Sequence, residues 1–180
     1  YYTQEKILFP CDCFGGYGDV SSKILDSENS EAELEAYKAE VVRYYANIMA
    51  SFNSFVIKAI DKIPADTKVI CPSHGIIWCE KKPQIVELYK KLAGYGSTCE
   101  FEPEVCVIWG SMYGYTKQGV DAVVRGLERK GAKYTMMQIP DTEATYVLAE
   151  AYKAKCLVLA MPTYEYKMFP PMAHILDLFE

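Results

Sequence analysis

The pattern of hydrophobic and polar positions differs between the first and second parts of this chain, and the first part contains a long helical pattern. Between residues 34 and 63, apolar residues recur at steps of three or four, which predicts helical structure with one apolar face. Ser30 and Glu33 stand just before it with the spacing of a capping box. Pro64 closes either one long helix or a second helix that follows a break near residues 51 to 54. The apolar positions are Leu34, Val41, Tyr45, Ile48, Phe52, Phe55, Ala59 and Ile63.

Short apolar runs stand before and after this helical part. Residues 6 to 9 (KILF) and 68 to 71 (KVIC) predict two short strands, and each runs into a loop. Pro83 can stand in the first turn of the next helix, and Gly94 can end that helix. Residues 97 to 103 lack periodicity and lie in a stretch that mixes Gly, Ser, Thr and Pro. We therefore expect a first domain at 1–96, a linker at 97–103 and a second domain at 104–180.

The second domain alternates predicted strands and helices. Residues 105 to 109 (VCVIW) form a continuous apolar run, as in a strand buried on both faces. Further strands are predicted at 133–139 and 156–160, with helices in the intervals between the strands. Such alternation predicts parallel pairing in a doubly wound α/β sheet.

Composition and charge narrow the class of protein. The 180 residues carry a formal net charge of -5 and contain no basic block, so a nucleic-acid partner is not expected. No apolar run is long enough for a membrane span and no signal peptide is recognisable, so we expect a cytoplasmic protein without a membrane partner. The seven cysteines form no CxxC pair, which favours reduced thiols. The chain begins with Tyr1 and ends at Glu180 within an apolar-periodic stretch, and we expect it to be a piece of a longer protein.

Two loops of the second domain carry candidate binding chemistry. The first, GSMYGYT at 110–116, joins a strand to a helix, where free backbone N–H groups and the helix dipole suit a phosphate. Ser111 and Thr116 add hydroxyl donors, and Gly114 lets the backbone approach closely. Neither the Walker pattern nor the GxGxxG pattern is present. The second loop, MPTYEYKMFPP at 161–171, is rich in aromatic rings, which suggests a flat, conjugated ligand.

The first domain offers a candidate metal pair. Asp12 and His74 each lie in a loop after a predicted strand, and a carboxylate with an imidazole suits iron, manganese or zinc. The alternative is that both are hydrogen-bonded structural groups. Cys11 and Cys13 flank Asp12, either as extra thiolate ligands in a zinc site or as small buried residues.

The loops of the second domain resemble those of flavodoxins, which bind flavin mononucleotide (FMN). SMYGYT is similar to the flavodoxin phosphate loop, and PTYEYKMFPPM is similar to the second flavin loop. That family often has Asn where Glu165 stands, and a carboxylate at this position is expected to alter the flavin potential. The resemblance implies a phosphate site at Ser111, Met112, Tyr113, Gly114, Tyr115 and Thr116, and a ring site at Pro162, Thr163, Tyr164 and Glu165.

The whole chain resembles the flavodiiron proteins through three further segments: LFPCDCFGG, YYANIMASF and CPSHGIIW. In that family a metallo-β-lactamase-like αββα domain with two irons precedes a flavodoxin-like domain with FMN. The resemblance implies the C-terminal part of the first domain followed by the N-terminal part of the second. Asp12 matches the carboxylate that bridges the irons, and His74 matches the last histidine ligand. The family's other ligands, in an HxExDH motif and a further histidine, are not in this sequence, so its diiron site is incomplete.

The resemblance also implies an activity and partners. Flavodiiron proteins reduce dioxygen to water or nitric oxide to nitrous oxide, with electrons from a donor such as rubredoxin. Their head-to-tail homodimers bring the flavin of one subunit near the metals of the other. We expect this activity for the parent protein and not for the chain alone. The alternatives are a metallo-β-lactamase-type hydrolase with an accessory flavodoxin domain, and a non-catalytic FMN electron carrier.

Overall fold

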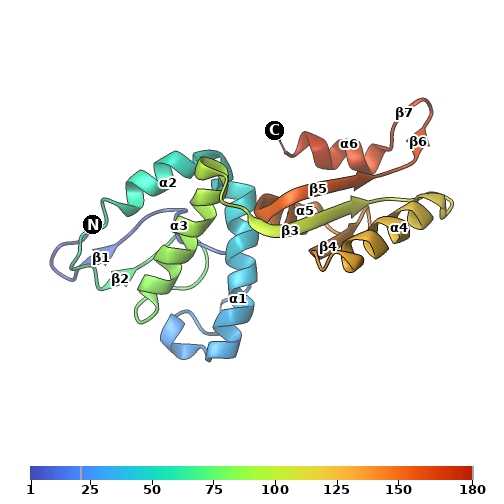
Figure 1. Ribbon diagram of the computed structural model, residues 1–180. Coiled ribbons are helices and arrows are strands. Elements are labelled where there is room, and N and C mark those ends of the chain that lie inside the picture. Colours follow the sequence, from blue (N-terminus) through green and yellow to red (C-terminus); the bar gives the residue numbers. More distant parts are fainter. Residues whose placement is uncertain (21, 180) are drawn as a thin grey trace. The chain divides into compact units, whose positions relative to one another are not determined.

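The computed structural model describes residues 1–20 and 22–179, which form two compact units, Tyr1–Glu100 and Phe101–Glu180 (Figure 1). Glu180, the last residue of the second expected domain, lies outside the described residues. Both units mix helices and strands, so the chain has an α/β fold. No helix among the described residues is long and apolar enough to cross a membrane.

The first unit packs helices against a small parallel sheet. Strands β1 (Ile7–Leu8) and β2 (Val69–Ile70) pair in parallel, with Ile7 opposite Val69 and Leu8 opposite Ile70. Between them the chain is helical, and the longest helix of the unit follows β2. The helical elements are η1 (Asp26–Glu28), α1 (Glu31–Tyr44), η2 (Tyr45–Met49), η3 (Ala50–Phe52), α2 (Asn53–Ile60) and α3 (Lys82–Thr98).

The long helical pattern is broken, as in the second of the two alternatives, but the irregular turns span residues 45–52 and so begin earlier than the expected 51–54. The predicted capping box is present, since Ser30 and Glu33 exchange their side-chain and backbone hydrogen bonds at the start of α1. After Tyr44 the backbone widens into a π-turn and then tightens into a 3₁₀ turn before α2 begins. The Tyr45 hydroxyl donates a 2.7 Å hydrogen bond to Asn53 Oδ1 across this break. This hydrogen bond thus joins the end of α1 to the start of α2 across the irregular turns.

Helix α3 continues past the glycine that was expected to end it. Gly94 lies within α3, and the helix ends only at Thr98, where Cys99 takes a left-handed conformation (φ +58°). Leu92 and Tyr95 on both sides of Gly94 are buried, and this packing outweighs the helix cost of a glycine, about 1 kcal/mol relative to alanine. Strand β3 begins at Glu102. The expected linker at 97–103 therefore has regular structure at both ends, and only residues 99–101 lie outside a helix or strand.

The start of α3 is organised by a buried carboxylate. Asp26, only 1% exposed, accepts hydrogen bonds from the backbone N–H groups of Cys79, Glu80 and Lys81, the last at 2.6 Å. No side chain caps the helix at Lys81 itself. A carboxylate from a distant segment therefore satisfies donors that would otherwise be unpaired near the helix N-terminus.

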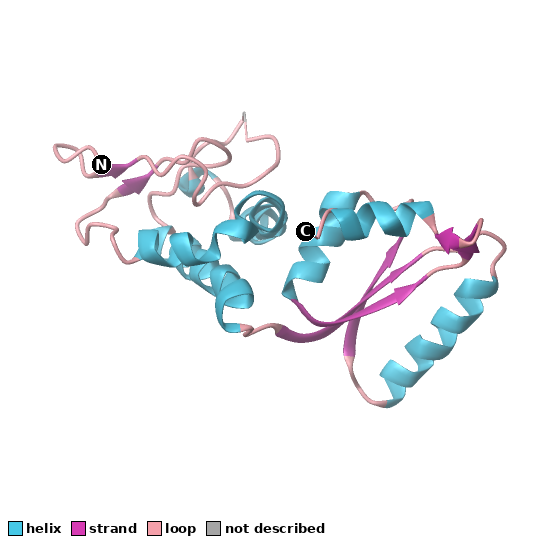
Figure 2. Cartoon of the chain, turned by 90° about the horizontal axis from the view of Figure 1, so that it is seen from above, coloured by secondary structure: helices cyan, strands magenta, loops and turns pink. Residues whose placement is uncertain are grey.

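The second unit is a parallel sheet with helices on both faces (Figure 2). Strand β3 (Glu102–Trp109) lies between β4 (Lys133–Gln138) and β5 (Ala154–Ala160), and pairs in parallel with each. The expected parallel pairing is therefore present. The helices are α4 (Tyr115–Arg129), α5 (Ala144–Lys153) and α6 (Pro170–Asp177), and a short hairpin of β6 (Thr163–Tyr164) and β7 (Lys167–Met168) lies between β5 and α6.

The apolar run of β3 is buried on both faces, as its sequence predicted. Val107 and Trp109 pack with Val120 of α4, whereas Cys106 and Ile108 pack in a second cluster. That second cluster includes Val147 of α5, and Met172 and Ile175 of α6. Because alternate residues of a strand point to opposite faces, α4 covers one face of the sheet, and α5 and α6 cover the other.

Candidate functional site

Asp12 and His74 meet at one edge of the small sheet in the first unit. Each follows a strand, and β1 and β2 are parallel, so both loops leave the sheet at the same end. His74 Nε2 lies 3.5 Å from Asp12 Oδ1, with the two side chains 58% and 46% exposed. Backbone hydrogen bonds join the loops, from Ser73 N to Cys11 O and from Gly16 N to His74 O. The structure thus brings the two predicted metal-ligating residues together at an accessible position.

Glycines permit the close packing beneath this pair. A Cβ atom on Gly75 would lie 2.2 Å from the Tyr37 hydroxyl oxygen, and one on Gly16 would lie 2.6 Å from it. Gly75 also has a φ of +88°, which favours glycine. The Tyr37 hydroxyl in turn accepts a hydrogen bond from the Ile76 N–H group at 3.3 Å. The glycine after His74 is therefore required by the packing of α1 against the loop.

A further residue lies at this pair that the sequence did not single out. Asp12, His74 and Tyr44 line an open pocket of about 610 Å³, in which Tyr44 comes from the last turn of α1. The Tyr44 and His74 ring centroids are 5.8 Å apart. Burial, followed by the nearby Asp12 carboxylate charge, raises the pKa of the Tyr44 phenol. Only the meeting of three distant segments of the chain reveals the pocket.

The cysteines around Asp12 behave differently from one another. Cys11 is exposed, whereas Cys13 is buried, and burial raises the pKa of the Cys13 thiol to about 12. Cys13 is thus packed in the core at 8% exposure, which agrees with its interpretation as a small buried residue. Among the described residues, no group of three or more His, Cys, Asp or Glu side chains could hold a metal ion. In the part of the chain that the structure describes, Asp12 and His74 therefore offer two donor side chains without a third.

The two predicted binding loops of the second unit leave neighbouring strands. The segment 110–114 follows β3 and the segment from Met161 follows β5, whose last residues Trp109 and Ala160 are register partners. The Gly110 N–H group donates to the Ala160 carbonyl at 2.9 Å. Helix α4 covers one face of the sheet, and α5 and α6 cover the other. The loops thus lie where the connections diverge to opposite faces, the usual ligand position in open α/β sheets.

The first of these loops leads into a helix N-terminus that no side chain caps. Helix α4 begins at Tyr115 without a side-chain cap, after Gly114 in a left-handed conformation (φ +84°). The Ser111 hydroxyl accepts a 3.0 Å hydrogen bond from the Gly114 N–H group, which folds the loop back toward the start of the helix. Met112, Tyr113 and Tyr115 are exposed, whereas Thr116 is half-buried. This arrangement can accept an anion from solvent.

The second loop contains a hairpin that the sequence did not predict. Thr163 pairs with Met168 and Tyr164 pairs with Lys167, so Glu165 and Tyr166 form a two-residue turn. Both turn residues have positive φ, +46° and +60°, as in a type I′ turn. Pro162 is half-buried, and the side chains of Tyr164, Glu165 and Tyr166 are exposed at the hairpin. The predicted ring-site residues 162–165 therefore lie on a projecting hairpin and the strand end before it.

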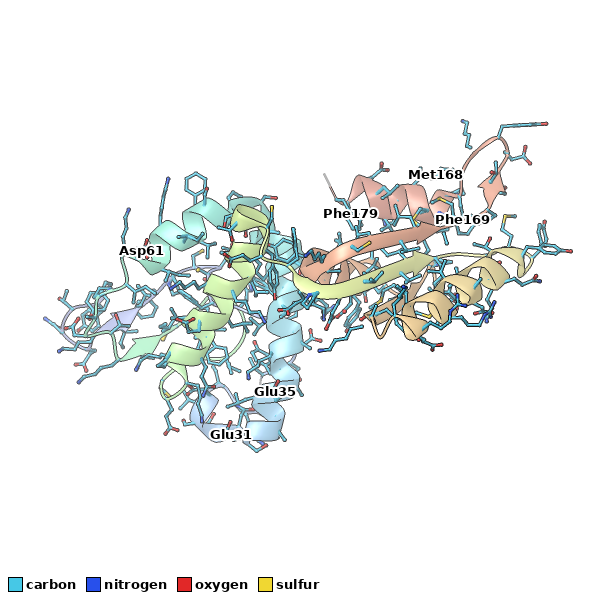
Figure 3. All side chains as sticks on the ribbon, viewed as in Figure 1. Glu31, Glu35, Asp61, Met168, Phe169 and Phe179 are labelled. Carbon is cyan, nitrogen blue, oxygen red and sulfur yellow. The ribbon has the colours of Figure 1, made fainter. Side chains whose placement is uncertain are left out.

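Phe169 connects the two loops. It lies immediately before α6 and after Met168, and both residues are labelled in Figure 3. A Cβ atom on Gly110 would lie 2.5 Å from Phe169 Cε1 and 3.0 Å from the Ile139 carbonyl oxygen. Gly110 is thus needed so that the aromatic ring can pack directly on the first loop.

Comparisons with known proteins give relatives over almost the whole chain. No family model matches it. An uncharacterised protein of Methanocaldococcus jannaschii is 30% identical over 177 residues, which cover 98% of this chain and 43% of the relative. A nitric oxide reductase of Moorella thermoacetica is 27% identical over 181 residues, again 98% of this chain and 43% of the relative. The chain therefore spans less than half the length of these relatives.

Solved structures agree in fold. The rubredoxin oxygen:oxidoreductase of Desulfovibrio gigas superposes with a TM-score of 0.88 at 21% identity, over 99% of this chain and 44% of that protein. The flavodiiron protein of Giardia intestinalis gives a TM-score of 0.86 at 24% identity, over 97% of this chain and 42% of that protein. At these identities the likeness concerns the fold.

Proposed function

This chain belongs to the flavodiiron protein family, and we propose that it is part of an FMN- and diiron-dependent oxidoreductase that reduces dioxygen, nitric oxide or both. One relative is named a nitric oxide reductase, and one structural neighbour is named a rubredoxin oxygen:oxidoreductase. Both names support a gas-reducing activity. Because the chain spans less than half of its relatives, the activity is proposed for the whole protein that contains it.

The observation that carries this proposal is the convergence of Asp12 and His74. In our proposal, residues 1–96 are the C-terminal part of a metallo-β-lactamase-like domain, and these two side chains are iron ligands. A carboxylate and an imidazole suit iron, and the pair opens into a pocket that a small gas molecule can enter. Two donors do not complete a dinuclear site, so the remaining ligands would come from residues outside this sequence. The irons would supply electrons to the bound gas.

The second unit supports an FMN site. In our proposal, residues 104–180 are the N-terminal part of a flavodoxin-like domain, and 111–116 bind the FMN phosphate. The Ser111 and Thr116 hydroxyls and the first N–H groups of α4 are suitable donors. Lys117 is paired with Asp121 at 2.9 Å, so the donor set consists of hydroxyl and backbone groups. Sheets with the order β4-β3-β5 bind flavin at this switch point in flavodoxins.

Residues 162–165 would line the flavin ring. Tyr164 offers an exposed aromatic face, and Pro162 and Thr163 follow β5, whose last residue Ala160 lies beside the start of the phosphate loop. FMN held by residues 111–116 and 162–165 would supply electron transfer between the donor and the metal site. A rubredoxin-type protein is the proposed donor, and a head-to-tail homodimer would bring the flavin of one subunit near the metals of the other.

The test compares two variants of the longest protein that the gene encodes, one in each proposed site, and measures FMN affinity and iron content in both. Ser111→Ala with Thr116→Ala should weaken FMN binding at least about tenfold by flavin fluorescence, since each lost hydrogen bond to a charged group costs about 1.5–3 kcal/mol. The iron content of that variant should stay unchanged. His74→Ala should lose iron and leave FMN affinity unchanged.

Other outcomes would overturn the proposal. A protein that binds FMN but no iron, and consumes neither gas, would be an electron carrier. A protein that binds metal, hydrolyses a lactam or ester and consumes neither gas would be a hydrolase of the metallo-β-lactamase type.

A further inference from the structure

Phe169 is fixed in the core of the second unit at the point where the β6–β7 hairpin ends. It directly follows β7, and its backbone carbonyl accepts hydrogen bonds from the Met172 and Ala173 N–H groups at 2.9 and 3.1 Å, at the start of α6. Its side chain is 9% exposed and packs in the cluster that contains Ile108 of β3 and Ile175 of α6. Both the sheet and α6 therefore hold the Phe169 ring.

The first loop accommodates this ring by having no side chain at Gly110. A Cβ atom on Gly110 would lie 2.5 Å from Phe169 Cε1 and 3.1 Å from Phe169 Cδ1, closer than carbon atoms in van der Waals contact. Gly110 does not have a positive φ, so its backbone conformation alone does not require glycine. The glycine that opens the first loop is thus explained by the aromatic ring that packs on it.

The hairpin depends on anchors at its base. Strands β6 and β7 contain two exposed residues each, and in the described part of the chain they pair only with one another (Figure 1). A two-stranded hairpin of this kind is at best marginally stable in water. The residues at its base that pack against the core cluster are Met161 on one side and Phe169 on the other. Phe169 therefore joins the hairpin to the core and, through Gly110, to the first loop.

We propose that Phe169 is a positioning residue that sets the spacing between the first loop and the hairpin, so that one FMN molecule binds to both. This inference deepens the proposed FMN site and rests on it, with the phosphate bound at 111–116 and the ring bound at 162–165. A ligand with two linked ends binds more tightly than either end alone when the two subsites are held at the right distance, because the second contact is then intramolecular. Phe169 acts through Gly110 and the hairpin, from within the core.

The experiment compares Phe169→Val with Ile175→Ala in the longest protein that the gene encodes. Both variants remove buried carbon atoms from the same cluster, and valine lacks the δ and ε carbons that lie against Gly110. FMN and riboflavin are titrated into FMN-free protein and followed by flavin fluorescence, and inorganic phosphate is titrated in competition with FMN. Riboflavin has no phosphate and probes the ring subsite, whereas inorganic phosphate probes the first loop alone.

The expected result is a selective loss of FMN affinity. Phe169→Val should weaken FMN binding about tenfold and change the affinities for riboflavin and inorganic phosphate less than about twofold, because only FMN bridges the two subsites. The preference for FMN over riboflavin therefore falls. Ile175→Ala should leave all three affinities unchanged, although both variants should lower the midpoint temperature of unfolding of the FMN-free protein.

An unchanged preference for FMN over riboflavin in Phe169→Val would overturn the inference, since Phe169 would then stabilise the hairpin without setting the spacing. A loss of inorganic phosphate affinity as large as the loss of FMN affinity would also overturn it, because Phe169 would then act on the first loop alone. The same loss of FMN preference in Ile175→Ala would assign the effect to the core as a whole. If Phe169→Val does not fold, Phe169→Leu, which lacks the ε carbons, gives the same comparison. Failure of the parent protein to bind FMN would instead overturn the proposed function.

Discussion

At the scale of single residues, the Asp26 carboxylate shows how burial and hydrogen bonding compete. Burial alone would raise the pKa of Asp26, but hydrogen bonds from the Cys79 side chain and from the N–H groups of Lys81, Cys79 and Glu80 lower it below its usual value. The carboxylate is therefore charged in the folded protein, where it stabilises the N-terminus of α3. Since α3 packs against the loop that holds Asp12, this contact also supports the pocket: the Tyr89 hydroxyl donates to Gly15.

Replacing Asp26 by Asn should lower the free energy of unfolding by about 2–3 kcal/mol at pH 7, because charge-assisted hydrogen bonds to a buried group are lost. The folded pKa is depressed, so the stabilisation by Asp26 is present above its usual pKa of 3.8 and is lost as the pH falls below it. Urea unfolding at pH 7 and near pH 3 measures both effects. Equal stability of the two proteins at pH 7 would show that the carboxylate is not important for the fold.

The residues of the candidate metal site differ in how far the sequence could predict them. The spacing of Asp12 and His74 after two short strands suggested that the two residues meet, because parallel strands present their loops at one end. Tyr44 could not be found in this way. Its place beside Asp12 and His74 depends on the packing of α1 against the two loops, and such contacts between distant segments are invisible in the sequence.

At the scale of elements, the apolar run of β3 was predictable because it is buried on both faces. The end of α3 was not predictable from Gly94, since the burial of Leu92 and Tyr95 depends on tertiary packing. The hairpin β6–β7 was missed for a different reason. Glu165 and Tyr166 are poor residues for a type I′ turn, which favours Asn-Gly, so the sequence carries no turn signal.

This poor match predicts a stabilising substitution. The double change Glu165→Asn and Tyr166→Gly should raise the free energy of unfolding by about 0.5–1.5 kcal/mol, because both new residues tolerate positive φ. The Tyr166 side chain is fully exposed, so little packing is lost. Thermal unfolding of FMN-free protein measures the change. A lower midpoint temperature would mean that the turn conformation is not the one described.

At the scale of the whole molecule, each unit holds one set of candidate residues. The sequence predicted an α/β fold with parallel strand pairing in residues 104–180, and both features are present. The order β4-β3-β5 depends on the side of β3 on which each connecting segment places the next strand. The periodicity of apolar residues does not contain this information. The proposed FMN and iron ligands imply coupling between the two sets of residues, since electrons would have to pass from a flavin to the metals.

The most direct test of that coupling is flavin reoxidation in the longest protein that the gene encodes. FMN bound to the protein is reduced anaerobically by light, mixed rapidly with nitric oxide or dioxygen, and followed by flavin absorbance. If electrons pass from FMN to the site at Asp12 and His74, reoxidation by at least one gas should be fast in the parent protein. With that gas it should be at least about a hundredfold slower in His74→Ala, which retains its FMN. Equal reoxidation rates in the two proteins would contradict the account, because the flavin would then react without the site at Asp12 and His74.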